Sequence, residues 1–132
     1  MRPYYDRDGI TIYHADCAEV LPLLPTVDLV CTDPPYGIAA ARVSFRGAPG
    51  SVVGSVLQAR RGDYGDADWD DEPVSPELMA QVVAAGEHAC IWGGNYYELP
   101  PSRQYVVWDK GEGFKGRDFA ECEQAWCSWD GN

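Results

Sequence analysis

A rigid turn directly follows an apolar segment in the first third of the chain. Residues 27–32 are almost continuously apolar, which predicts a buried strand. The next residues are Asp33, Pro34, Pro35 and Tyr36, and two consecutive prolines cannot donate backbone hydrogen bonds, so the strand must end there. Each proline holds its own φ and restrains the residue before it, so the free carbonyl groups point in fixed directions. The turn therefore presents rigid acceptors beside one carboxylate and one aromatic ring.

The segments before the turn follow a strand–helix–strand pattern. Residues 10–14 predict a first strand, and Asp16 then begins a short helix that Pro25 ends. Glu19, three residues after Asp16, completes a capping-box pattern. A continuous apolar run such as residues 27–32 is typical of a parallel strand that is covered on both faces. Together these segments predict a βαβ unit.

The second half of the chain continues the alternation. Ser75 and Pro76 predict a helix start, with serine at the N-cap and proline at the first helical position, and Gly86 ends the helix. Three more strands are predicted, at residues 88–92, 104–108 and 120–129. This alternation predicts an α/β protein, with residues 1–132 forming a single domain.

Residues 37–72 show no hydrophobic period and predict a mobile loop within this domain. A loop of this length is uncommon and is either functional or disordered. Since it directly follows the rigid turn, a lid that orders on substrate and plain disorder are both open interpretations.

The composition excludes several kinds of protein. No apolar run approaches the roughly 20 residues of a membrane span, and the first residues are not a signal peptide, so we expect a cytoplasmic protein. The five cysteines form no Cys-x-x-Cys pair and no cluster with histidine, which predicts reduced thiols and no metal site. Cys31 and Cys90 lie in apolar runs and are expected to be buried packing residues.

The net charge of −11 is unfavourable for a protein that binds nucleic acid, because such surfaces gain much of their affinity from Lys and Arg. Six acidic residues lie within ten positions, and we interpret this run as a solvated loop: Asp63, Asp66, Asp68, Asp70, Asp71 and Glu72. Strong binding to a DNA duplex would therefore need a contribution from elsewhere.

The groups of the turn suit an exocyclic amino group on a planar base: the acceptors can hold its hydrogens and the ring can stack on the base. Residues 33–36 have the sequence Asp-Pro-Pro-Tyr, and the chain resembles the DNA amino-methyltransferases that carry this motif. Residues 10–21, 91–95 and 107–110 also resemble segments of that family. An ordinary strand-ending turn is the alternative, because Asp-Pro often opens turns.

The resemblance implies methyl transfer from S-adenosylmethionine to adenine N6 or cytosine N4 of DNA, with adenine favoured by the aspartate at the first motif position. It implies that Asp33 and the Pro34 carbonyl hold the amine hydrogens so that the lone pair of the nitrogen is less conjugated with the ring. It also implies that Pro35 locks the turn and that Tyr36 stacks on a base flipped out of the duplex. No metal is needed.

The resemblance also assigns a cofactor role to Asp16 and Cys17, near the adenine ring of S-adenosylmethionine. The other interpretation of Asp16, as the cap of its helix, is compatible with that role.

One part of the family pattern is missing. The glycine-rich turn that approaches the methionine part of the cofactor has no match, since residues 111–116 lie between two late strands. In the family's sheet order, two further strands separate the first two strands predicted here. We therefore expect a partial doubly wound, Rossmann-like sheet that lacks strands on its cofactor-loop side and leaves the edge of residues 27–32 open.

Three outcomes for this open edge follow: the first strand pairs with it, a partner chain or a second copy supplies strands, or the fold is marginal.

The leading hypothesis is an incomplete or split DNA methyltransferase. Methylation of RNA or of a protein glutamine is a second enzyme reading, although those relatives more often carry Asn at the first motif position. The non-enzyme alternative is an inactive remnant or an acidic binding module that pairs with another chain.

Overall fold

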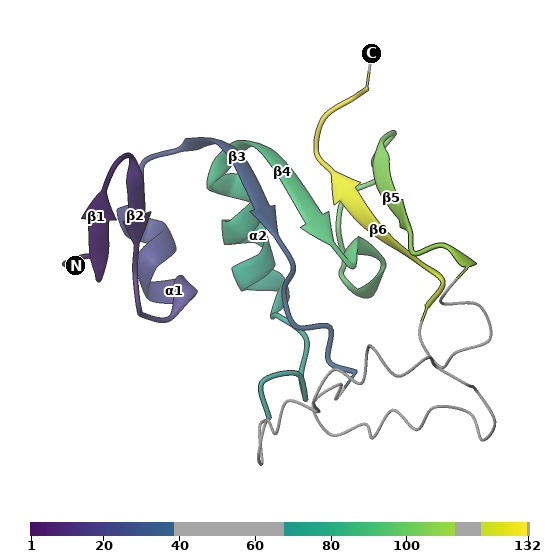
Figure 1. Cartoon of the computed structure of the whole chain (residues 1–132), viewed down its shortest axis with the longest axis horizontal. Coiled ribbons are helices and arrows are strands. Elements are labelled where there is room, and N and C mark those ends of the chain that lie inside the picture. The colour runs from purple at the N-terminus through teal and green to yellow at the C-terminus, as the bar shows by residue number, and fades with distance from the viewer. Residues whose placement is uncertain (39–67, 113–119, 132) are drawn as a thin grey trace.

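The computed structural model describes residues 1–38, 68–112 and 120–131 (Figure 1). Its helices and strands, in chain order, are β1 (Tyr5–Arg7), β2 (Ile10–Ile12), α1 (Cys17–Val20), the 3-10 turn η1 (Leu21–Leu23), β3 (Val27–Thr32), α2 (Pro76–Ala84), β4 (Gly86–Trp92), the 3-10 turn η2 (Gly94–Tyr96), β5 (Tyr105–Asp109) and β6 (Cys122–Cys127). Most of the predicted loop at residues 37–72 lies outside the described residues.

The larger sheet has the strand order β3-β4-β6-β5. β3 and β4 are parallel, whereas β4–β6 and β5–β6 are antiparallel. The prediction of an α/β protein is therefore confirmed, in the form of a mixed sheet with one helix on its face. The predicted strands are all present, and their observed bounds differ by one to two residues at most ends.

The N-terminal segment differs from the predicted βαβ unit. β2 pairs with β1 in an antiparallel hairpin, and among the described residues it does not pair with β3. The hairpin turn is formed by Asp8 at φ 54° and Gly9 at φ 76°. Left-handed conformation at both central residues gives a tight turn that suits strand twist, and Asp-Gly is a sequence preferred for it. This dipeptide was the signal for a hairpin that the strand–helix–strand interpretation overlooked.

The first helix is shorter than predicted. α1 covers only four residues and passes at once into η1, which contains Pro22. Proline lacks the N–H that an α-helix would use and its ring crowds the preceding turn. The predicted cap is confirmed, because the Asp16 carboxylate accepts a hydrogen bond from the Ala18 backbone N–H at 2.9 Å.

β3 has the predicted bounds but not the predicted burial. Leu29 is 51% exposed, and Val27 and Cys31 are exposed as well. Val27, Leu29 and Cys31 alternate with Val30 and therefore point to the other face of the sheet, which leaves them exposed on β3. Only the face that carries Val30 is covered, by packing against the core under α2. The expectation that Cys31 is a buried packing residue is therefore wrong.

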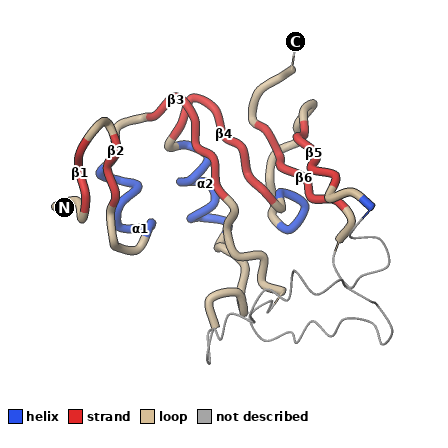
Figure 2. The backbone as a smooth tube through the Cα atoms, in the orientation of Figure 1, coloured by secondary structure: helices blue, strands red, loops and turns tan. Residues whose placement is uncertain are grey.

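α2 covers one face of the sheet, as Figure 2 shows along β3 and β4. The helix begins as predicted, with the Ser75 hydroxyl accepting a hydrogen bond from the Leu78 N–H at 3.2 Å. It ends at Ala84, and Gly86 already belongs to β4. The core beneath it consists of four buried residues: Met79, Ala89, Ile91 and Trp126.

A second, smaller buried cluster lies among β4 and β6. It consists of Cys90, Ala125 and Cys127, with Trp92 and Trp129 packed against it. The prediction that Cys90 is buried is confirmed, and all five cysteines are free thiols. No helix in the described ranges is long and apolar enough to span a membrane.

The core under α2 should carry much of the stability. Ile91 is fully buried, so we expect Ile91→Ala to lower the free energy of unfolding by about 2–5 kcal/mol, because it removes buried methyl groups and leaves a cavity. The matched control is Ile10→Ala, since Ile10 is 55% exposed on β2 and its truncation should change stability by less than about 1 kcal/mol. Urea denaturation measures both, and equal losses would contradict this placement of the core.

Candidate active site

The Asp33–Tyr36 turn lies where the sheet brings two strand ends together. β3 and β4 are parallel, with Thr32 aligned to Ile91, so both strands end at the same edge of the sheet. The turn follows β3, and the η2 segment follows β4. The carboxyl edge of parallel strands is the usual place for ligand sites in α/β proteins.

Tyr36 packs against its own motif and against η2. Its hydroxyl donates a short hydrogen bond to the Asp33 carboxylate. Its ring stacks on the ring of Tyr96, with the centroids 4.7 Å apart and the planes 10° from parallel. Burial, together with the hydrogen bond to Asp33 and that carboxylate's charge, raises the pKa of Tyr36 well above its usual range, so the hydroxyl keeps its proton. The predicted stacking ring is thus present and half-buried, with one aromatic neighbour already in place.

Tyr97 contacts the two proline carbonyls. Its hydroxyl oxygen lies 3.0 Å from the Pro34 carbonyl oxygen and 2.7 Å from that of Pro35. Its ring is half-buried and packs against the core under α2. Burial first, and then the charges of Asp33 and Asp70, raise the pKa of Tyr97 to about 12. The hydroxyl therefore stays a hydrogen-bond donor across the physiological pH range.

Asp70 holds the end of the turn from a distant part of the chain. It is only 2% exposed, and one carboxylate oxygen accepts hydrogen bonds from the backbone N–H groups of Tyr36 at 2.7 Å and Gly37 at 3.0 Å. Tyr36 also forms a β-bridge with Pro73. The interpretation of the acidic run as a solvated loop is therefore wrong at Asp70, which is a buried structural acceptor. Asp63 and Asp66 lie outside the described residues.

Two glycines make this packing possible. Gly93 has φ 65°, and a Cβ there would overlap the Tyr36 ring. Gly37 has φ 72°, and a Cβ there would overlap Pro73. Both positions combine a left-handed backbone with close approach of a neighbour, which only glycine accommodates without strain. The turn is thus held from the β4 side and from the Asp70–Pro73 side.

Asp16 and Cys17 do not join this arrangement. Both are exposed and lie at the start of α1, beside the β1–β2 hairpin and apart from the loop that follows β3 (Figure 1). No hydrogen bond or ring contact among the described residues links them to the Asp33–Tyr36 turn. The capping role of Asp16 is confirmed, while its cofactor role, like that of Cys17, stays a prediction.

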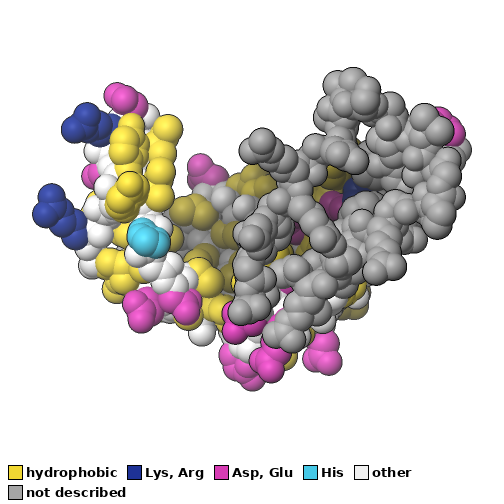
Figure 3. Space-filling model, turned by 60° about the horizontal axis from the view of Figure 1, so that its bottom comes forward, with side chains coloured by type: hydrophobic (Ala, Val, Ile, Leu, Met, Phe, Trp, Pro, Cys, Tyr) yellow, Lys and Arg dark blue, Asp and Glu magenta, His cyan; other side chains and the backbone are white. Residues whose placement is uncertain are grey.

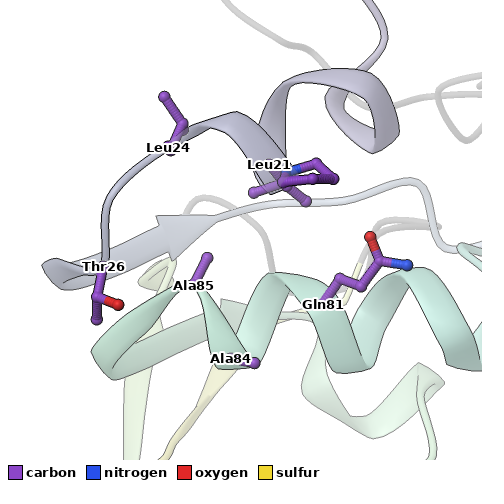
Figure 4. A pocket seen from close by; sticks show the side chains of 7 residues that line it. Leu21, Leu24, Thr26, Gln81, Ala84 and Ala85 are labelled. Carbon is purple, nitrogen blue, oxygen red and sulfur yellow. The ribbon is translucent and has the colours of Figure 1, made fainter.

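A groove of about 550 Å³ lies at the opposite end of β3, between η1 and the end of α2 (Figure 4). It is lined by Leu21, Pro22, Leu24, Thr26, Gln81, Ala84 and Ala85. None of these side chains titrates, so the groove offers no acid or base. The six residues of β3 separate it from Asp33, roughly 20 Å at the usual rise of a strand.

Within the described part of the chain, acidic side chains outnumber basic ones. Figure 3 shows Asp and Glu side chains along one rim, with Lys and Arg at the end that carries the hairpin. Lys110 is paired with Glu123, and Arg103 lies 3.6 Å from Asp130. Within the described ranges, no group of three or more His, Cys, Asp or Glu side chains could hold a metal ion.

Asp33, Pro34, Pro35 and Tyr36 lie together in the structure because they are consecutive in the chain. The structure adds Asp70, which sequence reasoning placed in a solvated loop, and it brings to the turn Tyr96 and Tyr97, which the sequence allowed either as lining of a base pocket or as core residues. The two tyrosines follow Gly93-Gly94 directly after a strand, a pattern that places them at the ligand edge of the sheet. Asp70 had no such signal, because its neighbours are also acidic and a buried acid looks like an exposed one in sequence.

A scan against models of protein families and searches of curated proteins and of solved structures found no match to this chain. Membership of the amino-methyltransferase family therefore rests on the motifs alone and stays a prediction.

Removal of the Asp70 carboxylate should loosen the turn. We expect Asp70→Ala to lower the free energy of unfolding by about 1–3 kcal/mol, because two buried N–H groups lose their acceptor. Asp70→Asn should lose less, since one oxygen remains. Hydrogen exchange should also show lower protection at the Tyr36 and Gly37 amides. Asp68→Ala, which truncates an exposed acid nearby, is the control. Unchanged protection in Asp70→Ala would contradict the anchoring role.

The raised pKa of Tyr97 predicts a stability change at high pH. The unfolded chain loses this proton near pH 10 and the folded chain near pH 12, so the folded state binds more protons between these values. Stability should therefore fall as pH rises through this window, and the contribution of Tyr97 should be fully present below it. Urea midpoints across the window should fall less steeply in Tyr97→Phe than in the wild type. Tyr4→Phe, at an exposed tyrosine, should leave the slope unchanged.

Proposed function

We propose that the Asp33–Tyr36 turn binds the exocyclic amino group of a DNA base, with adenine favoured, as the methyl-acceptor site of an S-adenosylmethionine-dependent methyltransferase. The observation that carries this proposal is the convergence of a carboxylate, a fixed proline carbonyl and an aromatic ring at the carboxyl edge of two parallel strands. Asp33 is exposed, and among the described residues only Tyr36 donates a hydrogen bond to it, through one of its two oxygens.

An aromatic amine is a weak nucleophile because its lone pair is spread into the ring. Two acceptors that hold its hydrogens favour the geometry in which the lone pair becomes available. Asp33 and the Pro34 carbonyl can each take one hydrogen, and the charged acceptor forms the stronger bond. As the amine gains positive charge, Asp33 stabilises it and can accept the proton that must leave. These roles need no covalent intermediate, so positioning of the base supplies much of the rate acceleration of methyl transfer.

The described residues do not by themselves form a cofactor site. The Asp16 carboxylate caps α1, Cys17 is exposed, and the sequence contains no glycine-rich turn between a first strand and a helix. We therefore propose that the methyltransferase is incomplete or split, and that further strands from another chain or segment supply this part. Among the described strands none pairs with the outer edge of β3, and Leu29 is exposed on the same strand; this supports the proposal, because an open edge beside apolar side chains favours pairing with an added strand.

The alternative is a catalytically inactive remnant or an acidic binding module that pairs with another chain. The same open edge and the net charge of −11 favour it. The two proposals differ in what happens when the missing strands are supplied, since only the first predicts methyl transfer.

The test is to co-express this chain with the polypeptide encoded directly downstream, and to measure transfer of labelled methyl groups from S-adenosylmethionine to adenine in DNA. We expect the 132-residue chain alone to bind S-adenosylmethionine weakly or not at all and to transfer no methyl group, and the completed enzyme to be active. Robust turnover by the isolated chain would show that no partner is needed. No transfer by the pair would favour the binding module.

In the active form, Asp33→Ala should abolish methyl transfer without unfolding the protein. Asp28→Ala is the matched control, since Asp28 is an exposed acid on β3, the strand that precedes Asp33, and should be dispensable. Retained transfer in Asp33→Ala would remove Asp33 from its assigned role.

A further inference from the structure

The two adjacent tyrosines of the η2 segment contact different groups of the turn. Tyr96 is 46% exposed and stacks on Tyr36, whereas Tyr97 points its hydroxyl at the carbonyls of Pro34 and Pro35. The Tyr97 oxygen carries a single hydrogen, which is shared between the nearer Pro35 carbonyl at 2.7 Å and the Pro34 carbonyl at 3.0 Å. Each carbonyl oxygen has two lone pairs, so the Pro34 carbonyl keeps the capacity to accept a second donor while Tyr97 contacts it.

We propose that Tyr97 is a positioning residue for the amino group of a bound base, because its hydroxyl holds the Pro34 carbonyl in the direction from which that carbonyl accepts an amine hydrogen. This inference rests on the base-binding part of the proposed function. Tyr97 acts through Pro34 and does not itself touch the base.

Tyr97 is well placed for this role because its ring is fixed. It packs against the core under α2, so the direction of its hydroxyl is set by core packing. The prolines restrict their own backbone torsions but not the tilt of the turn as a whole. A hydrogen bond from a core residue supplies that missing constraint. The raised pKa of Tyr97 keeps the donor protonated across the physiological pH range.

Other parts of the site do not replace this contact. The hydrogen bonds of Asp70 hold the N–H groups of Tyr36 and Gly37, which follow the prolines in the chain. The Tyr36 hydroxyl contacts Asp33, the other acceptor. Among the described side chains, the hydrogen bond to the Pro34 carbonyl comes from Tyr97. Loss of the Tyr97 hydroxyl should therefore affect recognition of the amino group and leave stacking intact.

The test compares two neutral nucleosides that differ only in this group: adenosine, and purine riboside, which lacks the exocyclic amine. Neutral ligands avoid repulsion between phosphate and the acidic chain. Binding to the 132-residue protein is measured by calorimetry or by NMR shifts. We expect the wild type to prefer adenosine by about fivefold, the value of one modest hydrogen bond.

Tyr97→Phe should reduce this preference to less than about twofold while the affinity for purine riboside is unchanged. Tyr96→Phe is the matched control, because it removes a hydroxyl from the neighbouring tyrosine and keeps the stacking ring; its preference should equal that of the wild type. A preference that persists in Tyr97→Phe overturns the proposal. So does equal or undetectable binding of the two nucleosides by the wild type, since no amine recognition would then exist.

A second measurement does not depend on a variant that must fold. With ¹³C-labelled proline carbonyls in the wild-type chain, adenosine should shift a carbonyl stretching band to lower frequency and purine riboside should not. The absence of a difference contradicts a role for the Pro34 carbonyl. Neither measurement requires methyl transfer, so a chain that recognises the amine but never methylates would contradict the proposed function and leave the role of Tyr97 standing.

Discussion

The parallel pairing of β3 with β4 is the contact on which the rest of the site depends. Its register aligns Thr32 with Ile91, so the chain leaves both strands at one edge. The double proline then meets the segment that follows Gly93, and the hydroxyl of Tyr97 reaches the proline carbonyls. A shift of one residue would turn Val30 away from the core and move the turn away from η2. Core packing and site geometry are therefore specified by the same register.

That pairing also leaves the other edge of β3 without a strand among the described residues. The same strand carries apolar side chains on its exposed face, with Leu29 half exposed, although the chain as a whole is strongly acidic. Net charge opposes self-association, while an open apolar edge favours it. A partner strand with a complementary apolar face would remove this conflict. The missing glycine-rich turn and the open edge among the described strands thus have one physical explanation in the split-enzyme proposal.

Within the site, the groups that would bind a base are engaged with one another. Tyr36 uses its hydroxyl on Asp33 and one ring face on Tyr96. A base that stacks on Tyr36 must use its other face or displace Tyr96, which is exposed and lies on a single 3-10 turn. The carbonyl of Pro34 and the second oxygen of Asp33 need no such exchange. Amine recognition is therefore the part of the proposed chemistry for which this geometry is already prepared.

The sequence by itself determined the local features: where β3 ends, which serine and aspartate cap helices, and which four residues form a rigid turn. These follow from proline, capping and apolar periodicity, which act over a few residues. The tertiary structure decided the rest. The Asp-Gly hairpin took the first strand out of the predicted βαβ unit, and Leu29 and Cys31 remain exposed on the face of β3 opposite Val30. Asp70 became a buried acceptor and Tyr97 a donor to the prolines because both are more than 30 residues from the turn in the chain, and only folding brings such groups into contact.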